Sequence, residues 1–220
     1  MDFAAMFETW KNVLTQPGEP VFEQERAKPT ATLQTALIWI VVAAVIAAIF
    51  SAISALISSF FNVGSAFLSS DLPPEAAAIM GGVGGGTAFG AFCFTLIGAP
   101  IGFLIGSGIY MLIAKLLGGT GTFEEQTYLL ATFTAPIMIV NSVISVVPIL
   151  GGCVSIFITI YQLVLTYYAI KVSHGMESGR AIATVLIPIV IVFLCVACGV
   201  VAIMATAGAA VFEGLNSGGF

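Results

Sequence analysis

The stretch "LLGGTGTFEEQTYLLATF", residues 116–133, lies between two long apolar runs and decides how the chain folds. Thr122 and Glu125 have the spacing of a capping box, which begins a helix. A phosphate-binding loop would need a preceding strand and a lysine at its end, and this stretch has neither. Glycine is the usual residue just past the end of a helix, so the stretch predicts a tight turn between two helices. The glycines of this turn are Gly118, Gly119 and Gly121.

The composition outside this turn is that of a membrane protein. Hydrophobic residues make up 59% of the 220 residues and charged residues only 8%, whereas charged residues are about 25% of a typical soluble domain. Four runs hold no acidic or basic residue, and the third, residues 127–170, is long enough for two spans with a break at Pro148 and Gly151. We therefore predict an all-α integral membrane protein, a five-helix transmembrane bundle. The predicted spans are about 33–61, 88–115, 127–147, 150–170 and 181–207.

The predicted spans divide the chain into three parts. Residues 1–32 form an N-terminal amphipathic helix and a linker, residues 33–212 the transmembrane domain, and residues 213–220 a short tail. The helix is predicted from apolar residues at helical spacing, with Trp10 at headgroup depth or the helix docked on the bundle. The segment after Pro20 is expected to be a polar linker, and residues 71–90 a mobile connection.

Orientation follows from the basic residues, because short cytoplasmic loops retain Lys and Arg. All six lie before the first span or in alternate connections, which predicts a cytoplasmic N-terminus and an extracytoplasmic C-terminus. They are Lys11, Arg26, Lys28, Lys115, Lys171 and Arg180.

Catalytic chemistry finds little support in the sequence. His174 is the only histidine, and a role at the end of the fourth span is favoured over catalysis because no nucleophile is paired with it. The Cys195 and Cys198 pair is better explained as small packing residues, since a thiolate deep in hydrocarbon is disfavoured. We expect no catalytic residue, cofactor, metal, nucleotide or nucleic acid. The spans also lack the charged residues of proton-driven transporters.

Some residues within the spans suggest close helix packing or a conduit through the membrane. Gly98, Gly102 and Gly106 recur every fourth position, which favours a close helix pair within the chain or a homo-oligomer seam. Pro136 predicts a kink. Asn141 and Tyr161 are polar groups at depth and mark a candidate conduit.

Several stretches together resemble one family. They are "VLTQPGEPVF" at residues 13–22, "KLLGGTGTFEEQTYLLATFTAP" at 115–136, and "VVPILGGCVSIFITIYQLVLTYYAIKVSHGMESGRAIATVLIP" at 146–188. With the five-span layout, they resemble the Yip (Ypt-interacting protein) domain family, in its prokaryotic branch, over about residues 13–207. The resemblance implies a non-enzymatic membrane protein of a prokaryotic plasma membrane. Eukaryotic members bind Rab-type small GTPases in vesicle traffic, and their Asp-Leu-Tyr-Gly-Pro motif has no counterpart here.

Two functions compete. The first is a membrane scaffold or adaptor, surrounded by membrane lipids, whose cytoplasmic face docks a protein partner. The alternative is a conduit for lipid or a small neutral solute, built around the polar groups at depth. The candidate partner face of the adaptor consists of Trp10, Phe22, Phe123, Gln126, His174 and Arg180.

Overall fold

The computed structural model describes the backbone of residues 3–69 and 74–217, and within them the side chains outside 62–84, 148–150, 202–203 and 205–217. The described residues form seven helices and no strand. The helices are α1 (Phe3–Thr15), α2 (Glu19–Arg26), α3 (Leu33–Ser69), α4 (Pro74–Leu116), α5 (Phe123–Ile144), α6 (Pro148–His174) and α7 (Ser178–Ser217).

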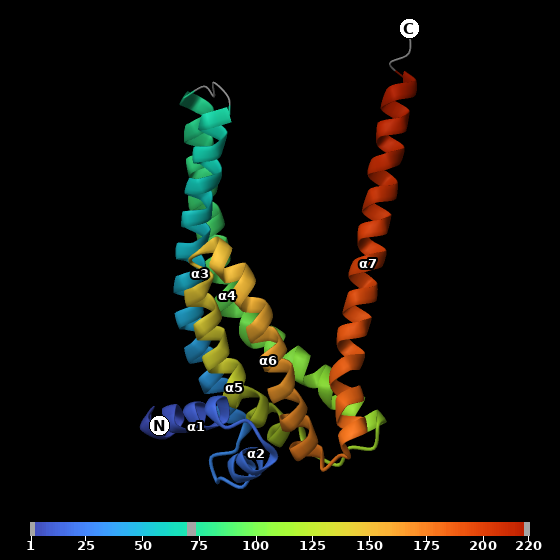
Figure 1. Cartoon of the computed structure of the whole chain (residues 1–220). Helices are drawn as coiled ribbons and strands as arrows, with labels where there is room; N and C mark the ends of the chain where they lie inside the picture. Colours follow the sequence, from blue (N-terminus) through green and yellow to red (C-terminus); the bar gives the residue numbers. More distant parts are fainter. Residues whose placement is uncertain (1–2, 70–73, 218–220) are drawn as a thin grey trace.

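Five of these helices are long and apolar enough to cross a membrane, which confirms the predicted fold class. Figure 1 shows α3 and α4 running side by side, while α7 stands apart from them along most of its length. At about 1.5 Å per residue, each of the five exceeds the roughly 30 Å of a bilayer's hydrocarbon core, and α3, α4 and α7 exceed it most. The apolar segments are Leu33–Phe61, Gly85–Leu116, Phe123–Ile144, Gly151–His174 and Ser178–Val201.

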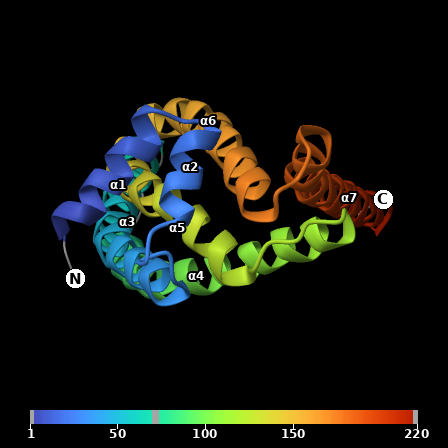
Figure 2. The ribbon, with the colours of Figure 1, turned by 90° about the horizontal axis from the view of Figure 1, so that it is seen from below.

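Helix α5 is the centre of the bundle. Of its most apolar window, 61% is buried inside the protein, against 28% or less for the other four segments. Tyr128, Leu129 and Phe133 of α5 are fully buried. Figure 2 shows the bundle from below, with α4 and α6 on opposite sides of the molecule and α7 at its far end. The central position of α5 explains why the turn before it determines so many contacts.

Helix α1 lies across the lower end of the spans (Figure 1). Its buried face packs through Trp10, whose ring meets that of Trp39 edge to face at 6.2 Å. Phe3 and Phe7 are exposed on the other side. The predicted amphipathic helix is therefore present, and it docks on the bundle through one face while offering apolar side chains to its surroundings through the other.

The expected polar linker after Pro20 is wrong, because the segment contains α2. Pro20 stands in the first turn of this helix, where its fixed φ and missing N–H are tolerated. Phe22 is fully buried, and its ring lies 6.2 Å from that of Phe133. An eight-residue helix is not stable alone in water. Tertiary contacts that the local sequence does not reveal therefore hold α2 in place.

The expected connection over residues 71–90 is also different in the structure. Helix α4 begins at Pro74 and runs without interruption to Leu116. The first turn accommodates a proline, and glycines in the following residues lower helix propensity by only about 1 kcal/mol each. The remainder of that connection, residues 70–73, lies outside the described residues.

Candidate functional site

Helices α1 and α2 lie at the lower end of the bundle in Figure 1, where α4 ends and α5 begins. We call this region the platform, and define it as α1, α2, the loop of residues 117–122 and the C-terminal turn of α6 with residues 175–177. Its elements are far apart in the sequence, so its geometry depends on the contacts described next.

The loop of residues 117–122 ends α4 and begins α5. Gly118 has a φ of 88°, and its N–H donates to the carbonyl of Lys115 at 3.1 Å. The Gly119 N–H reaches the carbonyl of Ala114 at 2.8 Å, which completes a Schellman motif. At the start of α5, Thr122 Oγ1 accepts from the Glu125 N–H at 3.2 Å, and the Glu125 carboxylate accepts from the Thr122 N–H at 3.3 Å. This capping box occupies the N–H groups of Thr122 and Glu125, which a phosphate at this helix start would need as donors.

The same loop packs tightly on the end of α6. A Cβ on Gly119 would lie 2.8 Å from Nδ1 of His174, and one on Gly121 would overlap the Ser173 carbonyl. Both approaches are below 3.0 Å, which real Cβ atoms essentially never show. The Thr120 N–H and hydroxyl both donate to the His174 carbonyl, at 3.2 and 3.1 Å. The two glycines are therefore required by close contact, beyond their role in the turn.

A buried polar network continues inward from this contact. His174 is 1% exposed, and its Nε2 lies 2.8 Å from Oε1 of Gln126. The Gln126 amide donates to the Ser107 carbonyl at 2.6 Å, and Ser107 Oγ lies 2.7 Å from Thr127 Oγ1. The network thus joins α6, α5 and α4. Nδ1 of His174 is buried and has no hydrogen-bond partner among the described residues.

Glu25 is a second buried group that sequence reasoning missed. It is 3% exposed and accepts from Lys28 Nζ at 2.7 Å. Its other oxygen lies 3.2 Å from Thr9 Oγ1 and 3.4 Å from the Tyr128 hydroxyl. The carboxylate therefore ties α1, α2 and α5 together. The sequence offered one signal for this ion pair, which is the three-residue spacing of Glu25 and Lys28.

Further polar contacts fasten the N-terminal helices to α6. The Arg26 guanidinium donates to the Val172 carbonyl at 2.7 Å. Lys171 forms an ion pair with Glu19. The Tyr161 hydroxyl donates to the Leu14 carbonyl at 2.7 Å. Tyr161, a candidate for the conduit, is thus used here to anchor the end of α1.

The six residues of the candidate partner face differ in burial. Four of them are buried, three within the platform and Gln126 on α5 next to it. Phe123 is half-buried, and Arg180 is exposed. Side chains that reach the surface nearby belong to Glu23, Gln24, Thr120, Thr122, Glu177 and Ser178. The buried four are Trp10, Phe22, Gln126 and His174.

The remaining structural motifs fall within the spans. A Cβ added at Gly102 or Gly106 would meet nothing within 4 Å, so no other helix packs closely there among the residues that the structure describes. The seam between two copies stays a prediction. Pro136 is buried within α5, and α6 begins at Pro148. Gly151 lies close to Ser145, since a Cβ would stand 3.0 Å from its Cα.

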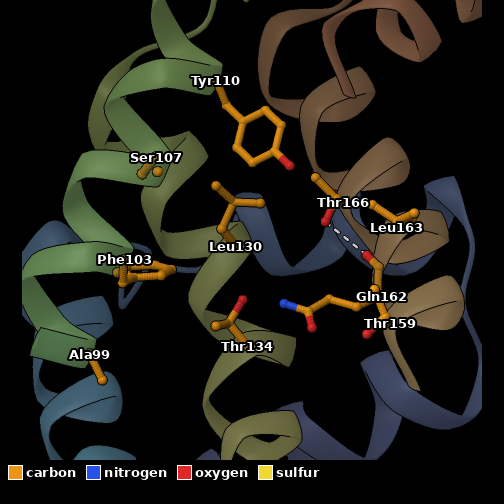
Figure 3. A pocket seen from close by; sticks show the side chains of 11 residues that line it. Ala99, Phe103, Ser107, Tyr110, Leu130, Thr134, Thr159, Gln162, Leu163 and Thr166 are labelled. Atoms are coloured by element: carbon orange, nitrogen blue, oxygen red, sulfur yellow. Dashed lines mark hydrogen bonds between the residues drawn. The ribbon is translucent and has the colours of Figure 1, made fainter. Parts of the chain in front are cut away.

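Two adjoining cavities share Thr134 and Gln162. The first, of about 380 Å³, lies between α4, α5 and α6, and the second, of about 440 Å³, is lined by α3 as well. We call them together the groove. Figure 3 shows the first, where Gln162 extends from α6 toward Thr134 of α5. Asn141 lines the second. Burying an amide without a hydrogen bond costs several kcal/mol, so the position of the Gln162 and Asn141 amides within the spans needs an explanation.

These features define a class of protein: a helical integral membrane protein with five membrane-spanning segments and a structured platform at one end of the bundle. A model of the Yip1 domain matches residues 11–199, which is more than half of the 220 residues. The chain therefore belongs to the Yip1 domain family, as its sequence predicted. No curated protein and no solved structure gives a significant match.

Proposed function

We propose that this protein is a non-enzymatic membrane scaffold or adaptor whose platform faces the cytoplasm and binds a protein partner. The observation that carries this proposal is that long-range hydrogen bonds hold the platform on the bundle. Arg26 contacts a carbonyl 146 residues away, and Tyr161 contacts one 147 residues away. A binding face that is rigid before association loses less conformational entropy when a partner docks.

The side chains available to the partner are polar and of mixed charge. Glu23 and Glu177 are exposed, and neither side chain has a hydrogen bond or ion pair within the described part of the chain. Arg180, three residues after Glu177, is also exposed. Phe123 is half-buried and offers apolar surface. The buried members His174 and Gln126 lie 2.8 Å apart, and His174 packs against Gly119 and Gly121 of the adjacent loop.

The test is co-purification from native membranes in nanodiscs, followed by mass spectrometry. The variant Glu23→Arg, Glu177→Arg reverses two unpaired surface charges without disturbing a described contact. We expect a co-purifying protein to be reduced at least about tenfold, because like charges that face each other at an interface cost more than the roughly 1.4 kcal/mol that makes a factor of ten. The matched control is Glu23→Asp, Glu177→Asp, which changes the same two exposed positions and keeps their charge. Equal recovery from all three forms would refute the proposal.

A conduit for lipid or a small neutral solute is the second candidate function. The observation that favours it is the groove, which brings Asn141, Thr134 and Gln162 along one cavity pair within the spans. Reconstituted liposomes test it directly, by scrambling of fluorescent lipid and by leak of neutral solutes. Rates equal to those of empty liposomes would exclude transport.

A further inference from the structure

Two polar stripes face each other within the membrane-spanning part of the bundle. Their members are spaced three, four or seven positions apart, so each stripe lies on one face of its helix. They line the groove described above. The stripe on α5 is Thr134 and Asn141 with Ser145 at the C-cap, and the stripe on α6 is Ser155, Thr159, Gln162 and Thr166.

Three of these side chains, Thr134, Asn141 and Gln162, have unused hydrogen-bonding capacity. The hydroxyls of Ser145, Thr159 and Thr166 donate to carbonyls of their own helices. By contrast, no hydrogen bond joins the side chains of Thr134, Asn141 or Gln162 to another residue that the structure describes. Thr134 and Gln162 lie near the middle of their spans, where hydrocarbon offers no partner. These groups therefore suit a ligand with polar atoms.

The lining also restricts the charge of that ligand. None of the described residues that line the groove is a Lys, Arg, His, Asp or Glu. A phosphate or carboxylate at this depth would lack a counter-charge, which makes its burial unfavourable. Hydroxyl and ester groups are uncharged and can accept from an amide or exchange hydrogen bonds with a hydroxyl. The groove thus matches an uncharged polar group.

Its walls and entrance indicate that the ligand is a lipid. Phe103, Leu130 and Leu163 line the first cavity beside the polar stripe and provide apolar contact. Thr159 is exposed on α6 next to exposed Ile156 and Ile160, so the polar stripe reaches the lipid-facing surface. Cavities of about 380 and 440 Å³ have room for the glycerol region and the first carbons of acyl chains.

We propose that the groove binds an uncharged lipid carrying hydroxyl and ester groups, of the diacylglycerol class, with Gln162 and Asn141 bonding to its glycerol region. This site lies within the membrane and does not depend on the adaptor role of the platform. Binding also does not require that the lipid be transported.

The test uses the full chain in phosphatidylcholine nanodiscs that contain a photoactivatable diacylglycerol. Crosslinked peptides are mapped by mass spectrometry for the wild type, for Gln162→Leu, and for the matched control Gln24→Leu on the exposed side of α2. We expect labelling within α5 or α6 that Gln162→Leu lowers about fivefold, the ratio that one average hydrogen bond makes in a binding constant. The control retains full labelling. Thermal unfolding of each variant verifies that the bundle is intact.

Competition then distinguishes the chemistry of the ligand. Unlabelled diacylglycerol should displace the probe, and phosphatidic acid should not. Equal displacement by both lipids would overturn the assignment of an uncharged ligand. Labelling that Gln162→Leu leaves unchanged would overturn the site itself. Leak of glycerol through the wild type without any lipid labelling would overturn the lipid proposal and indicate that the groove takes a small solute.

Discussion

At the scale of single residues, the platform depends on close contacts and on buried hydrogen bonds. Gly121 is the tightest point, because a Cβ there would overlap the Ser173 carbonyl. His174 is held by Gln126 at 2.8 Å on one side and by Thr120 on the other. Two predictions concern these residues.

The variant Gly121→Ala should destabilise the protein by about 1–3 kcal/mol, the usual cost of inserting a methyl group into a packed site. Thermal unfolding in detergent measures the loss. Gly108→Ala is the matched control, since a Cβ at Gly108 meets nothing within 4 Å. This control should be neutral or slightly stabilising because alanine favours the helix. Equal stability of the two variants would contradict the tight loop.

The pair Gln126 and His174 should be energetically coupled. Gln126→Leu or His174→Leu alone leaves a buried polar partner unsatisfied, at a cost of about 1–3 kcal/mol each. The double variant removes both partners, so its cost should be less than the sum of the two single costs. A double-mutant cycle on unfolding free energies gives the coupling. Strict additivity would show that the contact contributes nothing.

At the scale of elements, the structure contains one helix that the local sequence does not predict. The five spans follow from apolar runs that are about 20 residues or longer, and the turn before α5 follows from Gly118 and the capping box at Thr122. These signals are local. Helix α2 is different, because Phe22 is buried by Phe133 and Tyr168 from distant helices. The burial of Gln126 and Glu25 likewise depends on packing that no short stretch determines.

The variant Phe22→Ala should release α2 from the bundle. Truncating a fully buried phenylalanine costs about 3–5 kcal/mol, which is more than an eight-residue helix can offset by itself. Hydrogen exchange should become faster across residues 19–26 while α5 stays protected. Gln24→Ala, on the exposed side of the same helix, is the control. Unchanged exchange in α2 after Phe22→Ala would contradict the proposed anchoring.

At the scale of the whole molecule, the basic residues and the platform lie toward the same end of the bundle. Arg26, Lys28 and Lys171 contribute contacts there. Because basic residues are retained in the cytoplasm, this end should face the cytoplasm. Toward the opposite end of α3, Phe60 and Phe61 are exposed. The membrane therefore separates two ends of different chemistry.

Labelling of single cysteines checks this orientation. In a chain whose four cysteines are replaced by alanine, a membrane-impermeant maleimide should label Asp71→Cys in intact cells, because this residue lies in the sequence between the first two apolar segments. It should label Glu177→Cys only after the membrane is permeabilised. The reverse pattern would place the platform outside the cell and exclude a cytoplasmic partner.

Site-specific photo-crosslinking in native membranes tests the central claim most directly. A benzophenone amino acid replaces Glu177 on the platform, Phe123 beside it, or Phe157, which is exposed on α6 within the membrane. The adaptor account predicts a discrete protein adduct from Glu177 and Phe123 and none from Phe157. Adducts confined to Phe157, or no protein adduct from either Glu177 or Phe123, would contradict it.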